Sequence, residues 1–269
     1  MTMTTTIFVV GDRCAAFADQ TGARTVTDLV RELRAGVRQD ALVLAEGQGV
    51  TGYDWELIRD ELELAGLSSR ARIVTSERGR LAGRSQTHKR HEQNGLIAGL
   101  TRTGANTFRA DLRVHNDQEL QLDHQASHVQ GMVILEAARQ MFLAVCESYY
   151  RPLVPEHNPA YVYDRMECTF QQFLFPLDCT IECEVLAADL SGPERLLFDI
   201  RTTFHQAEAQ VAAVRMTGSA LDRERMLRKE ARRAQLALRH AIGNLLPGTE
   251  LLGDGLAAEP FEKLERTTR

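Results

Sequence analysis

Residues 122–145 constrain the fold of this chain more than any other segment. They read LDHQASHVQGMVILEAARQMFLAV, and from Met132 to Val145 only Glu136 and Arg139 are charged. A helix that is apolar on nearly every side must be buried. A carboxylate in such a helix is costly unless it is paired, protonated or used in chemistry. We therefore expect a long buried helix with Glu136 at a functional site.

The composition of the chain excludes several classes of partner. The 269 residues are 43% hydrophobic with a formal net charge of −5, which argues against a nucleic-acid or acidic-membrane binder. No apolar run approaches the roughly 20 residues that a membrane span needs. The first segment, MTMTTTIFVVGD, has no basic leader. The five cysteines lack metal-type spacing, so we expect reduced thiols, no metal site and a cytoplasmic protein.

Two patterns of secondary structure follow each other along the chain. Residues 1–77 alternate strands and helices, with strands expected at 7–10, 41–45 and 71–74 and helices at 26–33 and 53–64. This βαβαβ order predicts a small parallel sheet. Residues 78–94 are polar without apolar periodicity and are predicted to be a linker.

The second pattern covers residues 95–222. A hairpin is expected at 96–100 and 107–114, the apolar helix at 130–149, and four strands at 160–170, 180–186, 195–204 and 210–220. One apolar helix between two strands and four more indicates an antiparallel sheet wrapped round that helix, which is a hot-dog fold. The predicted fold class is therefore α+β. A charged helix at 223–247 and a tail at 248–269 follow.

The apolar helix and the loop before it carry a motif. The segment DHQASHVQGMVILEAARQ resembles the motif of the A-factor biosynthesis (AfsA-type) hot-dog domains, approximately DHxxDHVPGMLLLEAARQ. His88-Lys89 is similar to the start of that domain, and the resemblance covers roughly 85–222. The spacing of Gly131 and Glu136 is more distantly similar to the β-hydroxyacyl-carrier-protein dehydratases.

This resemblance implies an acyl-thioester substrate, carried on the phosphopantetheine of an acyl carrier protein or of coenzyme A, and no bound cofactor. It implies transfer of a β-ketoacyl group to a hydroxyl of a glycerol-type acceptor, in γ-butyrolactone, antibiotic or other specialised metabolism. Ser127 and Gln130 replace the Asp and Pro of the motif. Dehydration of a β-hydroxyacyl thioester and non-catalytic binding of acyl groups or carrier proteins therefore remain alternatives. A homodimer, with the two helices packed together, is also expected.

The two histidines and the carboxylate are the predicted catalytic groups. His124 is the expected general base, with His128 as its substitute, because a His and a carboxyl group can handle protons near neutral pH. Apolar surroundings are expected to raise the pKa of Glu136, which then supplies or receives a second proton. The alternative is a Glu136–Arg139 pair that only neutralises the helix. Asp123 and Arg139 are assigned supporting roles.

The start of the helix and a later aromatic run complete the predicted site. The N–H groups of Gly131 and Met132 are placed to polarise the thioester carbonyl, because a helix N-terminus carries a partial positive charge. Phe170, Phe173 and Phe175 are candidates for the lining of an acyl tunnel.

Two further features have competing interpretations. Gly47, Gly49 and Gly52 follow a strand and precede a helix, which is the context of a dinucleotide-binding loop. A capping box of Thr51 and Asp54 explains the same turn without a ligand, and it is the favoured interpretation. The basic residues of the helix at 223–233 form either a solvated face or a docking site for an acidic carrier protein.

Overall fold

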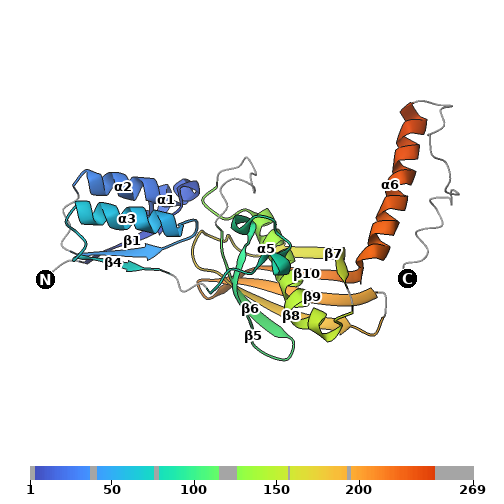
Figure 1. Cartoon of the computed structure of the whole chain (residues 1–269). Coiled ribbons are helices and arrows are strands. Elements are labelled where there is room, and N and C mark those ends of the chain that lie inside the picture. Colours follow the sequence, from blue (N-terminus) through green and yellow to red (C-terminus); the bar gives the residue numbers. More distant parts are fainter. Residues whose placement is uncertain are drawn as a thin grey trace.

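The chain folds into two parts, each with its own sheet and hydrophobic core (Figure 1). The computed structural model describes residues 4–36, 41–75, 79–114, 126–156, 158–192 and 195–245. The N-terminal part is coloured blue and cyan in Figure 1, and the C-terminal part runs from green to red.

The N-terminal part is a four-stranded parallel sheet with three helices on one side (Figure 1). Its elements are β1 (Thr4–Val10), α1 (Ala15–Thr21), β2 (Arg24–Thr25), α2 (Val26–Arg34), β3 (Ala41–Glu46), α3 (Gly52–Leu64) and β4 (Ala71–Val74), and the strand order is β2-β1-β3-β4. The predicted parallel sheet is confirmed. β2 and α1 were not predicted, because neither is long enough to show a periodic apolar pattern.

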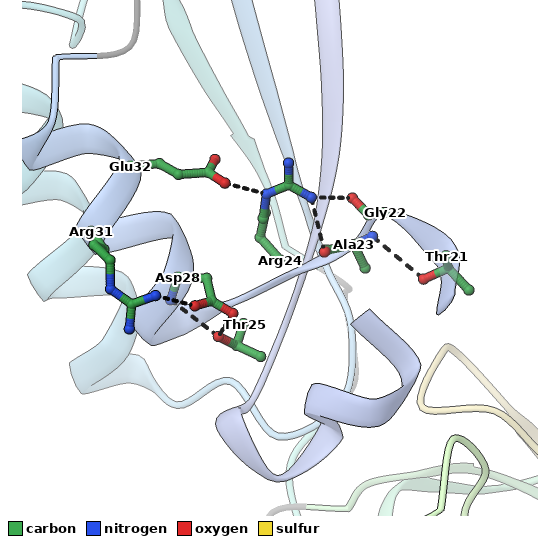
Figure 2. A network of polar contacts seen from close by, with 8 residues as sticks. All are labelled: Thr21, Gly22, Ala23, Arg24, Thr25, Asp28, Arg31 and Glu32. Atoms are coloured by element: carbon green, nitrogen blue, oxygen red, sulfur yellow. Dashed lines mark hydrogen bonds and ion pairs between the residues drawn. The ribbon is translucent and has the colours of Figure 1, made fainter. Parts of the chain in front are cut away.

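A polar network at the junction of β2 and α2 shows how so short a strand is held (Figure 2). The Thr25 side chain accepts a hydrogen bond from the backbone N–H of Asp28 at 3.1 Å and so caps α2. The Arg24 guanidinium donates to Glu32 at 2.6 Å and to the carbonyl of Gly22 at 2.8 Å. These bonds tie both ends of β2 to the adjoining helix and loop.

The C-terminal part is a six-stranded antiparallel sheet that curves around α5 (Figure 1). Its elements are β5 (Ile97–Arg102), β6 (Thr107–Leu112), α5 (Gly131–Val145), β7 (Pro159–Phe170), β8 (Thr180–Asp189), β9 (Arg195–Gln206) and β10 (Ala209–Asp222), in the order β5-β6-β8-β9-β10-β7. The predicted hot-dog fold is confirmed.

The core of this part lies between α5 and the concave face of the sheet. Alternate residues of β9 are buried, as expected for a strand with one face on a core. Phe204 of β9 and Phe142 of α5 are both fully buried in one cluster, together with Ile181 of β8. Burial of these large side chains is what holds the helix inside the sheet.

Residues 79–94, predicted as a linker, pack on the hot-dog sheet and on α5. Leu81 forms an isolated antiparallel bridge with Ala98 of β5. The segment also contains α4 (Arg84–Thr87), and Gln86 donates from its side chain to the Ser148 hydroxyl at 2.8 Å. Most of these contacts are polar or made by the backbone, so apolar periodicity could not have predicted them.

The two parts are joined through Gln48, whose residue exposure is only 1%. Its side-chain Nε2 donates to the carbonyl oxygens of Leu112 and Leu177 at 3.0 and 3.1 Å. Its Oε1 accepts from the backbone N–H of Val114 at 2.9 Å. The backbone N–H of Gln48 donates to the Pro176 carbonyl at 2.9 Å. One residue of the N-terminal part therefore bonds to two separate segments of the hot-dog part.

The chain leaves the sheet in α6 (Arg223–Leu245), which extends away from the body of the molecule (Figure 1). The helix begins beside the start of β7, where the N–H of Arg223 donates to the Asn158 carbonyl at 2.9 Å. Within the ranges that the structure describes, no helix combines the length and the apolar character needed to cross a membrane.

Candidate functional site

Glu136 lies on the second turn of α5 and is surrounded by donors. The Arg139 guanidinium donates to both of its oxygens, from Nε at 2.8 Å and from Nη2 at 2.9 Å. Lys89 reaches the same carboxylate at 2.6 Å, and the Gln140 amide reaches it at 3.0 Å. Three donors of this kind, two of them cationic, stabilise a carboxylate in its ionised form.

The prediction that the pKa of Glu136 is raised is therefore wrong. Burial does act in the raising direction, but the hydrogen bonds from Arg139, Lys89 and Gln140 outweigh it and lower the pKa to about 2. The Glu136–Arg139 pair, which was the predicted alternative, is present. The contact of Lys89 with Glu136 was not predicted, because Lys89 comes from the segment that was predicted to be a linker.

Gln140 ties this network to the hot-dog body. It is fully buried, accepts from the backbone N–H of Leu96 at 2.8 Å and donates to the Asn94 carbonyl at 2.8 Å. A buried amide with all of these partners can hold the neighbouring Glu136 in one position. Lys89 and Gln140 both lie in segments that resemble the AfsA-type family, His88-Lys89 and DHQASHVQGMVILEAARQ. That resemblance was the one sequence feature that could have assigned them to the site.

A second group of predicted residues gathers where α5 begins. The His128 ring lies against the Phe173 ring with their centroids 4.7 Å apart. Gly131 faces Phe170, and a Cβ on this glycine would come within 2.9 Å of the Phe170 ring. The imidazole, the helix start and two aromatic rings thus form one small surface. Met132, at the same helix start, is 54% exposed.

The start of α5 is the helix terminus that was predicted to polarise a carbonyl group. Gln130 is the N-cap residue, and its side chain makes no capping hydrogen bond to the helix. The approach to the helix is held by a hydrogen bond from the N–H of Val129 to the Leu174 carbonyl at 2.7 Å. The first backbone N–H groups of the helix, those of Gly131 and Met132, point away from the helix body, as they do in any α-helix.

The remaining predicted residues are placed differently. Asp123 and His124 lie outside the described residues. Phe175 contacts Phe17 of the N-terminal part, with ring centroids 5.9 Å apart, so it belongs to the joint between the two parts. Tyr163, which the sequence analysis did not select, lies beside Arg139, and burial raises the pKa of its hydroxyl to about 12.

The loop that contains Gly47, Gly49 and Gly52 is a capped turn, which was the favoured interpretation of its sequence. Thr51 and Asp54 form the complete capping box. Gly49 has a φ of +83°, and a Cβ on Gly11 would lie 2.5 Å from its carbonyl oxygen. This is a close backbone contact that only glycine allows. The loop also carries Gln48, so its packing serves the joint between the two parts.

A basic cavity of about 430 Å³ opens next to the Glu136 network. Its lining includes four cationic side chains and one histidine, Arg80, Arg84, Lys89, Arg113 and His91, against a single acid, Glu92. Lys89 belongs to both sites, because it lines this cavity and also bonds Glu136. Among the described residues, no cluster of His, Cys, Asp and Glu could hold a metal ion.

An antiparallel sheet wrapped round a long buried helix defines a hot-dog protein. Residues 77–222, more than half of the chain, match the family described as the A-factor biosynthesis hotdog domain. The chain belongs to this family. No curated protein sequence matches the chain.

Several solved structures are similar to part of the chain. The dehydratase heterocomplex ApeI:P from Xenorhabdus doucetiae shows 13% identity over 56% of this chain and 97% of that chain, with a TM-score of 0.43. A putative thioesterase from Shewanella oneidensis shows 8% identity over 46% and 83%, with a TM-score of 0.37. A conserved protein from Pseudomonas aeruginosa shows 15% identity over 45% and 86%, with a TM-score of 0.32.

Proposed function

We propose that this protein is an acyltransferase that moves a β-ketoacyl group from a phosphopantetheine thioester to a hydroxyl of a small acceptor. The observation that carries the proposal is the ionised Glu136, held by Arg139 and Lys89 on the helix whose N-terminus faces the predicted acyl site. The family to which residues 77–222 belong supports the thioester part of the proposal.

In the proposed reaction, one histidine of the loop before α5, His124 or His128, takes the proton of the acceptor hydroxyl. The hydroxyl oxygen bonds to the thioester carbonyl carbon, and the oxyanion that forms is stabilised by the N–H groups of Gly131 and Met132. The C–S bond then breaks as the carbonyl re-forms. The departing thiolate takes the proton back from the imidazolium, which leaves an ester and a free thiol.

The charge state of Glu136 argues against a dehydration in which Glu136 is the proton donor. Dehydration of a β-hydroxyacyl group needs a proton donor for the leaving hydroxyl as well as a base. A carboxyl group with a pKa of about 2 is ionised at neutral pH and holds no proton to donate. In transfer, one histidine both accepts and returns the proton. We therefore assign Glu136 a positioning role, in which it holds Arg139 and Lys89 in place.

The basic cavity supports an anionic substrate. Arg80 and Arg84 line it, and neither side chain has a hydrogen bond or ion pair with another described residue. A phosphate group suits such a cavity, because guanidinium groups bind phosphate oxygens in a bidentate manner. The phosphate could belong to the phosphopantetheine arm or to a phosphorylated acceptor.

Exposed apolar side chains support the expected homodimer. Met132 at the start of α5 and Met166, Phe170 and Phe173 at or near the end of the edge strand β7 are all more than a third exposed. Exposed apolar side chains beside a strand edge that no described strand pairs with are typical of a protein interface. We propose that two copies meet over this surface, which includes the start of α5.

The test is a conversion assay with matched histidine variants. The protein is incubated with β-ketoacyl and β-hydroxyacyl carrier-protein thioesters, with dihydroxyacetone phosphate or dihydroxyacetone, and products are identified by mass spectrometry. We expect an acyl ester from the β-ketoacyl thioester and a preference for the phosphorylated acceptor. Replacing the catalytic histidine by alanine, in H124A or H128A, should lower the rate at least 100-fold.

The controls separate the alternatives. H205A removes a histidine from the outer face of the sheet and should keep full activity. If the phosphate of the acceptor occupies the cavity, R84A should lose the preference for the phosphorylated acceptor. If the phosphate of the pantetheine arm occupies the cavity, R84A should instead raise the KM for the thioester. Loss of water from the β-hydroxyacyl thioester would support a dehydratase instead. Binding without conversion of any substrate would support a non-catalytic acyl-binding protein.

A further inference from the structure

The helix α6 carries an exposed apolar stripe that the proposed reaction does not use. The stripe consists of Leu227, Ala231, Ala234, Leu238 and Ala241, and all five residues are exposed. Leu227 is 58% exposed and Leu238 is 54% exposed. Their spacing alternates between four and three residues, which is the heptad spacing of a helix that pairs with another helix.

Most of the basic residues of α6 lie on the other side of the helix. Each residue turns an α-helix by about 100°. On this basis the following basic residues lie roughly 100° or more from the centre of the stripe: Arg225, Arg228, Lys229, Arg232, Arg233 and Arg239. Beyond the first turn of the helix, the charged residue nearest to the stripe is Glu230, which is acidic and not basic. Two such stripes can therefore meet without bringing these six basic residues together.

The rest of the described chain does not cover this stripe. Among the described elements, α6 makes its main contacts with β10 and β7, at the end where it begins. Figure 1 shows the remainder of the helix extending away from the sheet. A helix of 23 residues is about 35 Å long, and most of the stability of helices in proteins comes from the packing of an apolar face.

We infer that the stripe on α6 pairs with the same stripe of a second copy of this chain. A heptad stripe is self-complementary, so a two-fold axis between two copies buries both stripes at once. The alanines allow the two helices to approach closely. An acidic carrier protein would instead bind the opposite, basic face, which this pairing leaves open.

This interface is separate from the one proposed for the active site. α6 starts beside Pro159 at the beginning of β7, whereas Phe170 and the start of α5 lie at its other end. A strand of 12 residues is about 40 Å long, so the two surfaces cannot be parts of one contact. Pairing through α6 therefore doubles whatever assembly the hot-dog parts form.

The experiment measures the mass of the intact protein by light scattering after size exclusion. In the seam variant L227Q/L238Q we expect half of the wild-type mass, unchanged circular dichroism and unchanged acyl transfer. The matched control R225Q/R232Q makes the same number of glutamines on the basic face, and it should keep the wild-type mass. A234C should form a covalent dimer under oxidation, whereas R232C should not.

Equal masses for the wild type and the seam variant, with no cross-link through A234C, would overturn the inference. Loss of carrier-protein binding in the seam variant at unchanged mass would overturn it as well, and would assign the stripe to that partner. The proposed function is tested apart from this, because the seam variant keeps the histidines and the Glu136 network.

Discussion

Glu136 shows how a charge is accommodated in an apolar helix. Burial alone would favour the neutral carboxyl group. Arg139 is one helical turn away, but Lys89 comes from 47 positions earlier in the chain and bonds the same carboxylate at 2.6 Å. The network makes Glu136 a fixed negative charge. Its influence on the reaction then passes through the cations that it holds.

The low pKa of Glu136 predicts how stability depends on pH. The folded-state pKa, about 2, lies below the ordinary value of 4.5. The ionised form is therefore favoured by folding, and this contribution is complete above about pH 5 and is lost as the pH falls toward 2. E136Q removes it, so the difference in unfolding free energy between wild type and E136Q should shrink over that range.

Urea unfolding of both proteins at several pH values between 8 and 2.5 measures this difference. E56Q, on the exposed face of α3, is the control, and its difference from wild type should stay near zero throughout. A change in the E136Q difference between pH 6 and 8 would mean that the carboxyl group titrates near neutrality, and the positioning role would then be wrong.

At the scale of elements, the path of β10 over α5 depends on one glycine. The register of β10 against β7 shifts between Thr217 and Gly218. A Cβ on Gly218 would lie 2.9 Å from the Val162 carbonyl oxygen and 3.1 Å from the Phe142 ring. The strand can approach the helix at this point because the residue has no side chain.

G218A should therefore destabilise the protein by about 1–3 kcal/mol, the usual cost of overpacking a core. The change is measured by chemical denaturation. G52A is the matched control, because a Cβ there meets nothing within 4 Å and the residue opens α3. We expect its effect to stay within about 0.5 kcal/mol. A stability of G218A equal to that of G52A would show that the strand simply shifts to make room.

At the scale of the whole molecule, the two parts are expected to unfold together because Gln48 joins them. Its amide bonds two carbonyl groups and one N–H of the hot-dog part. Each partner left without a bond costs about 1–3 kcal/mol when it stays buried. Q48A should then lower the stability by about 2–4 kcal/mol and weaken the coupling of the two parts.

The sequence provides a probe for this coupling. Trp55 is the single tryptophan of the chain and is buried in the N-terminal core, so its fluorescence reports on that part. Far-ultraviolet circular dichroism also follows the hot-dog sheet. The two transitions should coincide in the wild type and separate in Q48A. Q20A, at an exposed position, should behave as the wild type does. Coincident transitions in Q48A would mean that other contacts join the parts.

The sequence by itself determined the elements whose signal is local. The apolar run of α5 and the alternation in β8 and β9 predict a buried helix and half-buried strands, because such periodicity reflects which face meets a core. Their order was enough for the hot-dog fold. The Thr51–Asp54 cap was also readable, because both of its partners lie within four residues.

Only the tertiary structure decided the charge of Glu136 and the use of the loop around Gln48. The charge of Glu136 depends on Lys89, which is far from it in the sequence. The packing of Gln48 depends on Leu112, Val114 and Leu177, which are also far from it in the sequence. A pKa is set by the groups that surround the charge in space. A buried amide is likewise satisfied by whichever backbone groups the fold brings to it, and no local pattern records that choice.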